Sequence, residues 1–233
     1  MIIMLTFKLN ILPKGHRNRP GHFMQPKGLL FHTTNNWKDG SGDEMHGKYM
    51  ATTDRTVSWH DTVDKDSWTR HLPHNENGWH AGDGSGGHFN RNWLGLEIAC
   101  EAVELGQPLD KATYNNAVDA AAQIMMEHGW DSEDQLEPHK VVYGKNCPHH
   151  TLLDHDQFKS DVLALIKLRT QALLQPVQIC RFSDVPNKHW ASVSIEKVAE
   201  AGIFAGYPDG TFKPDQTVTR AELAAVVVRL LGK

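Results

Sequence analysis

The spacing of apolar residues separates a strand-rich first part of the chain from helical later parts. Between residues 28 and 100, short apolar runs alternate with Gly, Asn, His and Trp, a pattern typical of strands in a half-buried sheet. In the run 93–99, the alternation places Glu97 on the face opposite to three apolar residues. These are Leu94, Leu96 and Ile98. The same period places His60, in the run 56–63, opposite to Val57, Trp59 and Val63. We therefore expect His60 and Glu97, together with His32 at the end of the apolar run 28–31, to line one side of a mixed sheet.

Two longer segments have the 3.6-residue period of amphipathic helices. Asp110 is placed to cap the first helix and Gly129 to end it. The second is expected to begin near Asp154 and to stop before Pro176. Together with the preceding strands, these helices predict an α/β domain in which a mixed central sheet is flanked by helices.

The last part of the chain has a different pattern, with short helices and a turn-rich connection. One predicted helix is closed by Gly202, and another is opened by Thr219 and Glu222 in the arrangement of a capping box. We predict a small α-helical module here. The expected domains are residues 1–168, a helix end and linker at 169–180, and the module at 181–233.

Composition limits the possible functions. The 233 residues are 39% hydrophobic and 22% charged, which suits one full-sized domain and a small one. A net charge of −4 predicts no general binding of nucleic acid. Three cysteines argue against a disulfide framework. The apolar start is too short and poorly flanked for a signal peptide or a membrane span, so we expect synthesis in the cytoplasm without a signal peptide and no membrane insertion.

The candidate chemistry centres on His32, His139 and Cys147. Two histidines and one thiolate form a three-ligand zinc set that leaves one position open for water, as in metallohydrolases. Each residue has an ordinary alternative, since a single His is commonly a hydrogen-bonded surface or core residue and a single Cys a small buried hydrophobe. His149 and His150 follow Cys147 closely and are alternative ligands. Residue chemistry alone leaves the ligand set open.

Residues from about 20 to 160 resemble the type-2 N-acetylmuramoyl-L-alanine amidases, which share a fold with peptidoglycan recognition proteins. The resemblance is strongest to phage and prophage lysins of Gram-positive bacteria. It rests on Phe31-His32-Thr33-Thr34, Ser58-Trp59-His60, Leu72-Pro73-His74-Asn75-Glu76-Asn77-Gly78-Trp79-His80-Ala81-Gly82-Asp83-Gly84, Gly95-Leu96-Glu97-Ile98, Pro138-His139-Lys140 and Gly144-Lys145-Asn146-Cys147-Pro148.

The resemblance implies one zinc ion held by His32, His139 and Cys147, and peptidoglycan as substrate. It further implies that Glu97 acts as general base toward the attacking water and that Lys145 stabilises the oxyanion. Outside that context, Glu97 would be interpreted as an exposed strand carboxylate in a surface ion pair, and Lys145 as a solvated side chain.

Three further residues are candidates for binding the sugar or the stem peptide: His60, His80 and Trp79. The two histidines can instead orient other groups of the site, and large aromatic residues are more often part of the core. The segment 86–92 departs from the usual family pattern, so its contacts with substrate are left open.

Residues 181–233 resemble one S-layer homology repeat, a module that anchors proteins to secondary polysaccharides of Gram-positive cell walls. The matching residues include Phe182-Ser183-Asp184-Val185, His189-Trp190-Ala191, Ala201-Gly202-Ile203, Gly206-Tyr207-Pro208-Asp209-Gly210-Thr211-Phe212 and Thr219-Arg220-Ala221-Glu222. The resemblance implies that Arg220 pairs with an anionic group of the polymer and that Trp190 contributes to binding. Thr219 and Glu222 are equally explained as a helix cap. The family usually has three packed repeats and this chain has one, so binding by the single module and self-association are both open.

The expected function is therefore a zinc amidase that cuts peptidoglycan as a phage or prophage endolysin acting on the Gram-positive cell wall. The alternatives are a non-catalytic peptidoglycan-binding protein, a bacterial autolysin, or an S-layer-associated wall protein.

Overall fold

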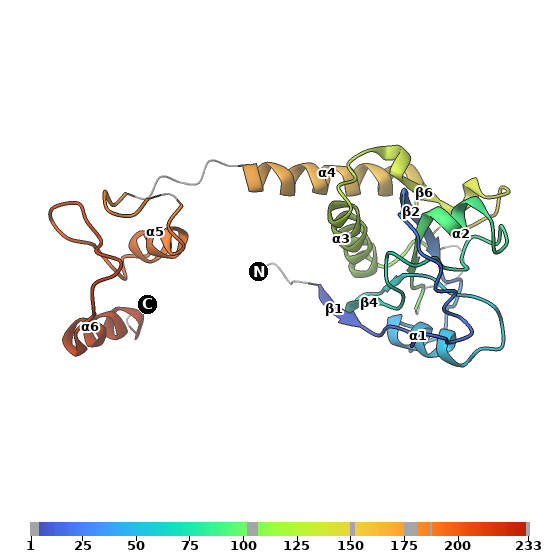
Figure 1. The fold of residues 1–233 in the computed structure, drawn as a ribbon, viewed down its shortest axis with the longest axis horizontal. Coiled ribbons are helices and arrows are strands. Elements are labelled where there is room, and N and C mark those ends of the chain that lie inside the picture. The colour runs from blue at the N-terminus through green and yellow to red at the C-terminus, as the bar shows by residue number, and fades with distance from the viewer. Residues whose placement is uncertain (1–4, 102–106, 150–151, 175–180, 187, 232–233) are drawn as a thin grey trace. The chain divides into compact units, whose positions relative to one another are not determined.

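The chain folds into two compact units, Met1–Thr170 and Gln171–Lys233. The structure is a computed structural model and describes residues 5–101, 107–149, 152–174, 181–186 and 188–231 (Figure 1). The two units are described separately. Within the described ranges, none of the helices combines the length and the apolar character needed to cross a membrane.

The first unit is built on a six-stranded mixed sheet with the order β1-β4-β3-β5-β2-β6. Only the β3–β4 pair is antiparallel among these neighbours. The strands are β1 (Thr6–Leu9), β2 (Gly28–Thr33), β3 (Asp61–Val63), β4 (Ser67–Arg70), β5 (Trp93–Ile98) and β6 (Leu136–Pro138). With the helices described below, this sheet confirms the predicted α/β fold class.

Helices α3 (Lys111–Glu127) and α4 (His155–Leu174) pack on one face of the sheet and form the main core with it (Figure 1). The core is formed by apolar residues of β2, β5 and both helices, including Leu29, Phe31, Leu94, Leu96, Ile124 and Phe158. As predicted, the Asp110 side chain caps α3 by accepting hydrogen bonds from two backbone N–H groups, and Gly129 follows the helix with a φ of 70°. Helix α4 continues to Leu174, six residues into the segment predicted as a helix end and linker. Pro176 and Cys180 lie outside the described residues.

The opposite face of the sheet carries the polar residues. Strands β2 and β5 are parallel neighbours in a register that places His32 opposite Glu97, while Phe31 is opposite Leu96. Because side chains alternate along a strand, His32 and Glu97 lie on the same face, away from α3 and α4. The predicted direction of the Glu97 side chain is confirmed.

Helices α1 (Asp43–Thr52) and α2 (His88–Asn92) complete the first unit. Met50 of α1 packs with Trp59 and Leu72 in a small hydrophobic cluster that is separate from the main core. Two short 3-10 helices, η1 (Glu133–Gln135) and η2 (His139–Val141), flank β6.

The prediction for the run 56–63 is wrong in part. Only residues 61–63 form a strand, and a bend at His60 interrupts the alternation. Val57 and Trp59 therefore pack with Met50, whereas Val63 joins the main core. His60 is fully buried and does not face a cleft.

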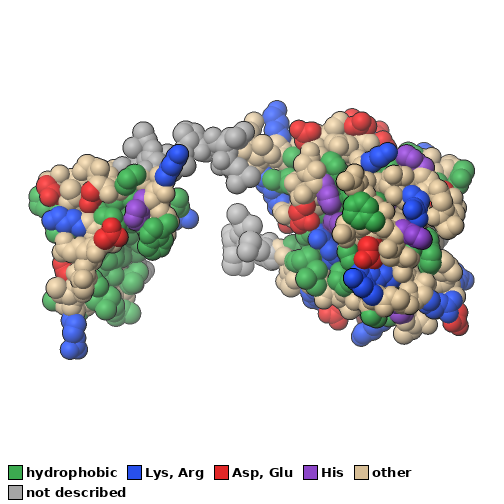
Figure 2. All heavy atoms as spheres, in the orientation of Figure 1, with side chains coloured by type: hydrophobic (Ala, Val, Ile, Leu, Met, Phe, Trp, Pro, Cys, Tyr) green, Lys and Arg blue, Asp and Glu red, His purple; other side chains and the backbone are tan. Residues whose placement is uncertain are grey.

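The second unit contains α5 (Ser192–Glu200) and α6 (Arg220–Leu231), which confirms two predicted helices. Gly202 follows α5 with a φ of 67°, and Thr219 and Glu222 exchange the hydrogen bonds of a capping box at the start of α6. Its small core contains Phe182, Val185 and Ile195. No described residue of α6 is buried. Figure 2 shows hydrophobic side chains gathered on the surface of this unit. Exposed examples are Leu223, Val227, Val228, Leu230 and Leu231.

Candidate metal centre and active site

The structure brings His32, His139 and Cys147 together, with ligand atoms that all lie within 4.8 Å of one another. His32 is near the end of β2, His139 begins η2 directly after β6, and Cys147 lies in the following loop. Because β2 and β6 are paired neighbours, the two histidines meet at one edge of the same ladder, with ring centroids 4.3 Å apart. Among the described residues, this is the group that can hold a metal ion.

The donor atoms of this group fit zinc. The Nε2 atom of His32 is 3.1 Å from His80 Nδ1, and that of His139 is 2.8 Å from the Ala81 carbonyl oxygen. Both Nδ1 atoms therefore remain for a metal, and His32 Nδ1 is 3.7 Å from Cys147 Sγ. Two imidazole nitrogens and one sulfur are ligands that zinc prefers, and three protein ligands leave a position for a reacting molecule.

Burial shapes the protonation of these ligands. It lowers the pKa of His32 well below its ordinary value, with further lowering by His139, His80 and Lys145. Burial also lowers the pKa of His139. Both imidazoles are thus held neutral, the form that binds metal. Burial, followed by the charge of Glu97, raises the pKa of the Cys147 thiol to about 12. A bound cation would offset this effect, since a coordinating thiol is deprotonated.

Glu97 lies beside the cluster, with Oε1 3.9 Å from His32 Nδ1. Its side chain is 15% exposed, and its Oε2 is buried without a hydrogen-bond partner among the described residues. Burial raises the pKa of Glu97 to about 8. This side chain does not match the alternative of an exposed carboxylate in a surface ion pair. A buried carboxyl group with a shifted pKa beside a candidate metal site is typical of a catalytic acid or base.

Lys145 approaches the same cluster from the Cys147 loop. Its Nζ is 3.4 Å from the Ala81 carbonyl oxygen, the same atom that accepts from His139. A Cβ atom at Gly82 would collide with the Lys145 Nζ, so the absence of a side chain there makes room for the lysine. Lys145 therefore brings a basic side chain close to the candidate ligands.

The three predicted substrate-binding residues lie in different surroundings. His60 has both ring nitrogens occupied, by the Gly95 N–H and the Glu76 carbonyl oxygen, each at 2.9 Å. His80 is buried, and its Nδ1 is hydrogen-bonded to Nε2 of His32. The half-buried Trp79 is part of a backbone bridge with Ser58.

The alternative ligands are not part of the cluster where the structure describes them. His149 donates its backbone N–H to Thr33 Oγ1 at 3.3 Å, and it is not a member of the metal-binding group. His150 lies outside the described residues.

A pocket of about 240 Å³ opens next to Glu97. Helix α1 forms one wall of it. The pocket is lined by Thr34, Asn36, Met45, His46, Tyr49, Trp59 and Glu97. The sequence pattern did not single out the α1 residues, because the period of that helix is weak. Only the tertiary fold, in which α1 packs against β3 and β4, brings its residues to the pocket that Glu97 also lines.

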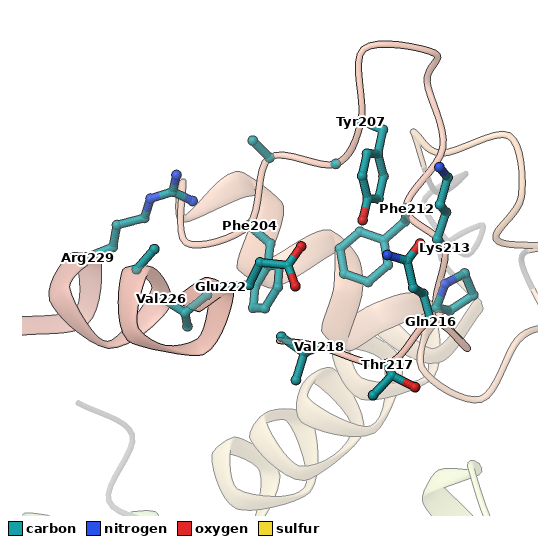
Figure 3. A pocket seen from close by; sticks show the side chains of 14 residues that line it. Phe204, Tyr207, Phe212, Lys213, Gln216, Thr217, Val218, Glu222, Val226 and Arg229 are labelled. Carbon is teal, nitrogen blue, oxygen red and sulfur yellow. The ribbon is translucent and has the colours of Figure 1, made fainter. Parts of the chain in front are cut away.

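The second unit has a pocket of about 410 Å³ between α6 and the preceding loop (Figure 3). Its lining includes Phe204, Tyr207, Phe212, Lys213, Glu222 and Arg229. Lys213 Nζ lies 4.1 Å from the centroid of the Tyr207 ring. Neither predicted polymer-binding residue lines this pocket. Arg220 is exposed at the start of α6, and Trp190 is 90% exposed on a loop before α5.

Two family models match the chain. Residues 22–150 match the model described as N-acetylmuramoyl-L-alanine amidase, and residues 181–224 match the S-layer homology domain. Among curated proteins, N-acetylmuramoyl-L-alanine amidase CwlH of Bacillus subtilis (strain 168) is 40% identical over 152 residues, which cover 65% of this chain and 58% of the relative. The chain thus spans somewhat more than half the length of that protein.

A solved structure and a cell surface glycoprotein match the two units separately. A solved structure titled "Mutant endolysin from Bacillus subtilis" has 38% sequence identity and a TM-score of 0.60, and the match covers 68% of this chain and 99% of that one. Cell surface glycoprotein 1 of Acetivibrio thermocellus is 54% identical over 52 residues, 22% of this chain and 2% of the relative.

Proposed function

The chain belongs to the N-acetylmuramoyl-L-alanine amidase family, and on that premise we propose that it is a zinc-dependent hydrolase of bacterial peptidoglycan. The bond cut is the amide between N-acetylmuramic acid and L-alanine. The observation that carries the proposal is the group of His32, His139 and Cys147 with Glu97 beside it. A binding protein has no need of an open metal position next to a buried carboxyl group with a raised pKa.

The side chains divide the chemistry between them. Zinc held by the three ligands would supply Lewis acidity toward water and the scissile carbonyl. Glu97 accepts a proton from the attacking water and passes it to the leaving amine, a role supported by its position and its raised pKa. Lys145 stabilises the negative charge that develops on the carbonyl oxygen. The pocket beside α1 receives the part of the substrate adjoining the cut bond, because Glu97 forms part of its lining.

We propose that residues 1–168 are the catalytic domain and that residues 181–233, joined to it through 169–180, bind the cell wall. The match to the S-layer homology domain supports this, as does the similarity to a cell surface glycoprotein. Secondary cell-wall polysaccharide is the proposed ligand. Trp190 offers an exposed ring for stacking on sugar, and Arg220 an exposed guanidinium for an anionic substituent.

The biological role that fits these activities is that of an endolysin. The similarity to a structure titled as an endolysin supports it. Expression in a Gram-positive host, with and without agents that open the membrane, tests this role. Lysis only after the membrane is opened is expected, and lysis without it would favour an exported autolysin.

Product analysis on purified peptidoglycan tests the reaction. We expect new amino-terminal alanine without new reducing sugar, loss of activity on chelation, and recovery on addition of zinc. Cys147→Ser is the matched control. New reducing sugar would identify a glycosidase, and peptidoglycan binding without any product would identify a binding protein.

A truncated chain ending at residue 174 tests the division of labour. It is expected to cleave soluble muropeptides like the full chain and to sediment less with intact walls, because the module raises the local concentration of enzyme on its substrate. Equal sedimentation of both chains would contradict the assignment of the second unit to wall binding.

A further inference from the structure

The hydrogen bonds behind the metal centre determine which ring nitrogen of each ligand carries a proton. The Nε2 of His80 lies 3.1 Å from the Trp93 carbonyl oxygen. A carbonyl oxygen only accepts, so Nε2 of His80 carries the proton and its Nδ1 presents a lone pair. That lone pair accepts from Nε2 of His32 at 3.1 Å. The Nδ1 of His32 is consequently left with a lone pair directed at the ligand cluster.

The second histidine ligand is fixed in the same way by the adjoining residue. Nε2 of His139 lies 2.8 Å from the Ala81 carbonyl oxygen and donates to it, which leaves Nδ1 of His139 for a metal. The same oxygen lies 3.4 Å from Lys145 Nζ. Two consecutive residues, His80 and Ala81, thus contact both histidine ligands and the lysine of the site.

The dipeptide is itself held by one buried side chain. The carboxamide oxygen of Asn90 accepts from the backbone N–H groups of His80 and Ala81, each at 2.8 Å. Its Nδ2 donates to the Gly84 carbonyl oxygen at 3.0 Å. Asn90 is 2% exposed and belongs to α2, which contributes no ligand to the cluster. All its polar side-chain atoms are therefore used to hold the loop that carries His80 and Ala81.

The space around His80 leaves its ring little freedom. A Cβ atom on Gly95 would lie 2.7 Å from the Cγ of His80, and one on Gly78 would lie 3.2 Å from its Cδ2. The ring of His60 packs on another side, with its centroid 5.7 Å away. The imidazole of His80 therefore fits between two glycines in the orientation that its two hydrogen bonds require.

We propose that His80, the Ala81 carbonyl and Asn90 form a positioning frame that orients both histidine ligands and sets which nitrogen each presents to the metal. The inference rests on the proposed zinc site and deepens it. These residues hold the ligands and do not touch the reacting atoms. Loss of such outer hydrogen bonds commonly weakens metal binding by about 10- to 100-fold.

The first test compares two substitutions of His80 in the full chain. His80→Asn places Oδ1 where Nδ1 stood and can still accept from His32, whereas His80→Leu has a similar volume and no acceptor. Competition with a chromophoric chelator measures the zinc dissociation constant. We expect a rise of about 10- to 100-fold for the leucine variant and a rise of less than about fivefold for the asparagine variant.

The second test separates positioning from general destabilisation. Asn90→Ala removes the link to the dipeptide. Asn18→Ala is the matched control, because Asn18 is also fully buried and bonds a backbone carbonyl, that of Met50 at 2.8 Å, on a part of the fold without a ligand. Thermal unfolding is recorded for both. We expect comparable losses of melting temperature but weaker zinc binding, by about 10-fold or more, in the Asn90 variant alone.

Several outcomes would overturn the proposal. If His80→Leu and Asn90→Ala bind zinc as tightly as the unaltered chain, the frame has no positioning role. If Asn18→Ala weakens binding as much as Asn90→Ala, the effect is one of stability alone. If the unaltered chain binds no zinc, the proposed function fails, and this inference with it.

Discussion

Replacing Glu97 by glutamine is expected to slow the reaction and to stabilise the metal-free protein at the same time. The substitution keeps the shape of the side chain and removes its charge. If Glu97 is the general base, as proposed, kcat is expected to fall by about 10²–10⁴. The proposed stoichiometry of one zinc per chain is expected to be unchanged, because Glu97 is not one of the three proposed ligands.

The effect on stability follows from the raised pKa. The carboxyl group has a pKa of about 8 in the folded protein, against an ordinary value of 4.5. Below pH 4.5 it is protonated in both states. As the pH rises toward 8, the unfolded chain releases the proton and the folded chain keeps it, so the free energy of unfolding falls. This linkage amounts to about 3 kcal/mol between pH 5 and pH 8. The glutamine side chain does not titrate, so the variant does not lose this part of its free energy of unfolding.

Denaturant unfolding of the zinc-depleted full chain at pH 5, 7 and 8 measures the difference. Tryptophan fluorescence is a suitable probe, because six of the 7 tryptophans lie in the first unit and only Trp190 lies in the second. The stability advantage of the glutamine variant is expected to grow with pH and to shrink when zinc is added, since a nearby dication favours the ionised carboxylate.

A stability difference that stays constant from pH 5 to pH 8 would refute the reasoning about the carboxyl group. Near-normal turnover in the variant would refute its role as base. The stability readout and the turnover readout are independent. A variant that gains stability but keeps its turnover would show that Glu97 is a buried carboxyl group of the site that takes no part in proton transfer.

Three further predictions concern other parts of the first unit. Cys147→Ser is expected to lose most of its bound zinc in metal analysis, because a neutral hydroxyl is a far poorer ligand than a thiolate; full retention would point to another ligand. Gly95→Ala is expected to cost about 1–3 kcal/mol of stability and to weaken zinc binding through its clash with His80, whereas Gly86→Ala, with open space around it, is the control. Asp61→Asn is expected to cost about 3–5 kcal/mol at pH 7 in denaturant unfolding. Although burial opposes it, the charged partners lower the pKa of this carboxyl group from 3.8 to about 2, so about 2 kcal/mol of that cost is expected to be lost as the pH falls through this range.

The sequence predicted the features that depend on local pattern. Strict alternation fixed the direction of Glu97 on β5, and the capping signals at Asp110 and Thr219 fixed the starts of two helices. The pairing of β2 with β5 and β6 requires tertiary contacts, and only this pairing brings His32 beside Glu97 and His139. For that reason the resemblance to a family, and not the residue pattern, supplied the ligand set.

The errors and omissions have a physical cause as well. The bend at His60 breaks the period of two. The alternation predicted that this ring lines the polar face of the sheet, whereas it is fully buried and packs against His80. Asn90 had no sequence signal, because a buried asparagine that bonds backbone groups looks like any polar residue of a loop. In the sequence, the segment 86–92 is distinguished only by its departure from the family pattern.

The oxygen that holds His139 and Lys145 belongs to the main chain of Ala81, and this limits what conventional mutagenesis can find. Ala81 is fully buried, and its methyl group packs with Leu30 and Trp93. Scanning every amino acid at this position would report the volume available to the side chain, while the carbonyl would remain in each variant. An amide-to-ester replacement of the bond that follows Ala81 would instead weaken the acceptor without altering any side chain. A complete survey of substitutions would otherwise miss an atom that contacts both His139 and Lys145.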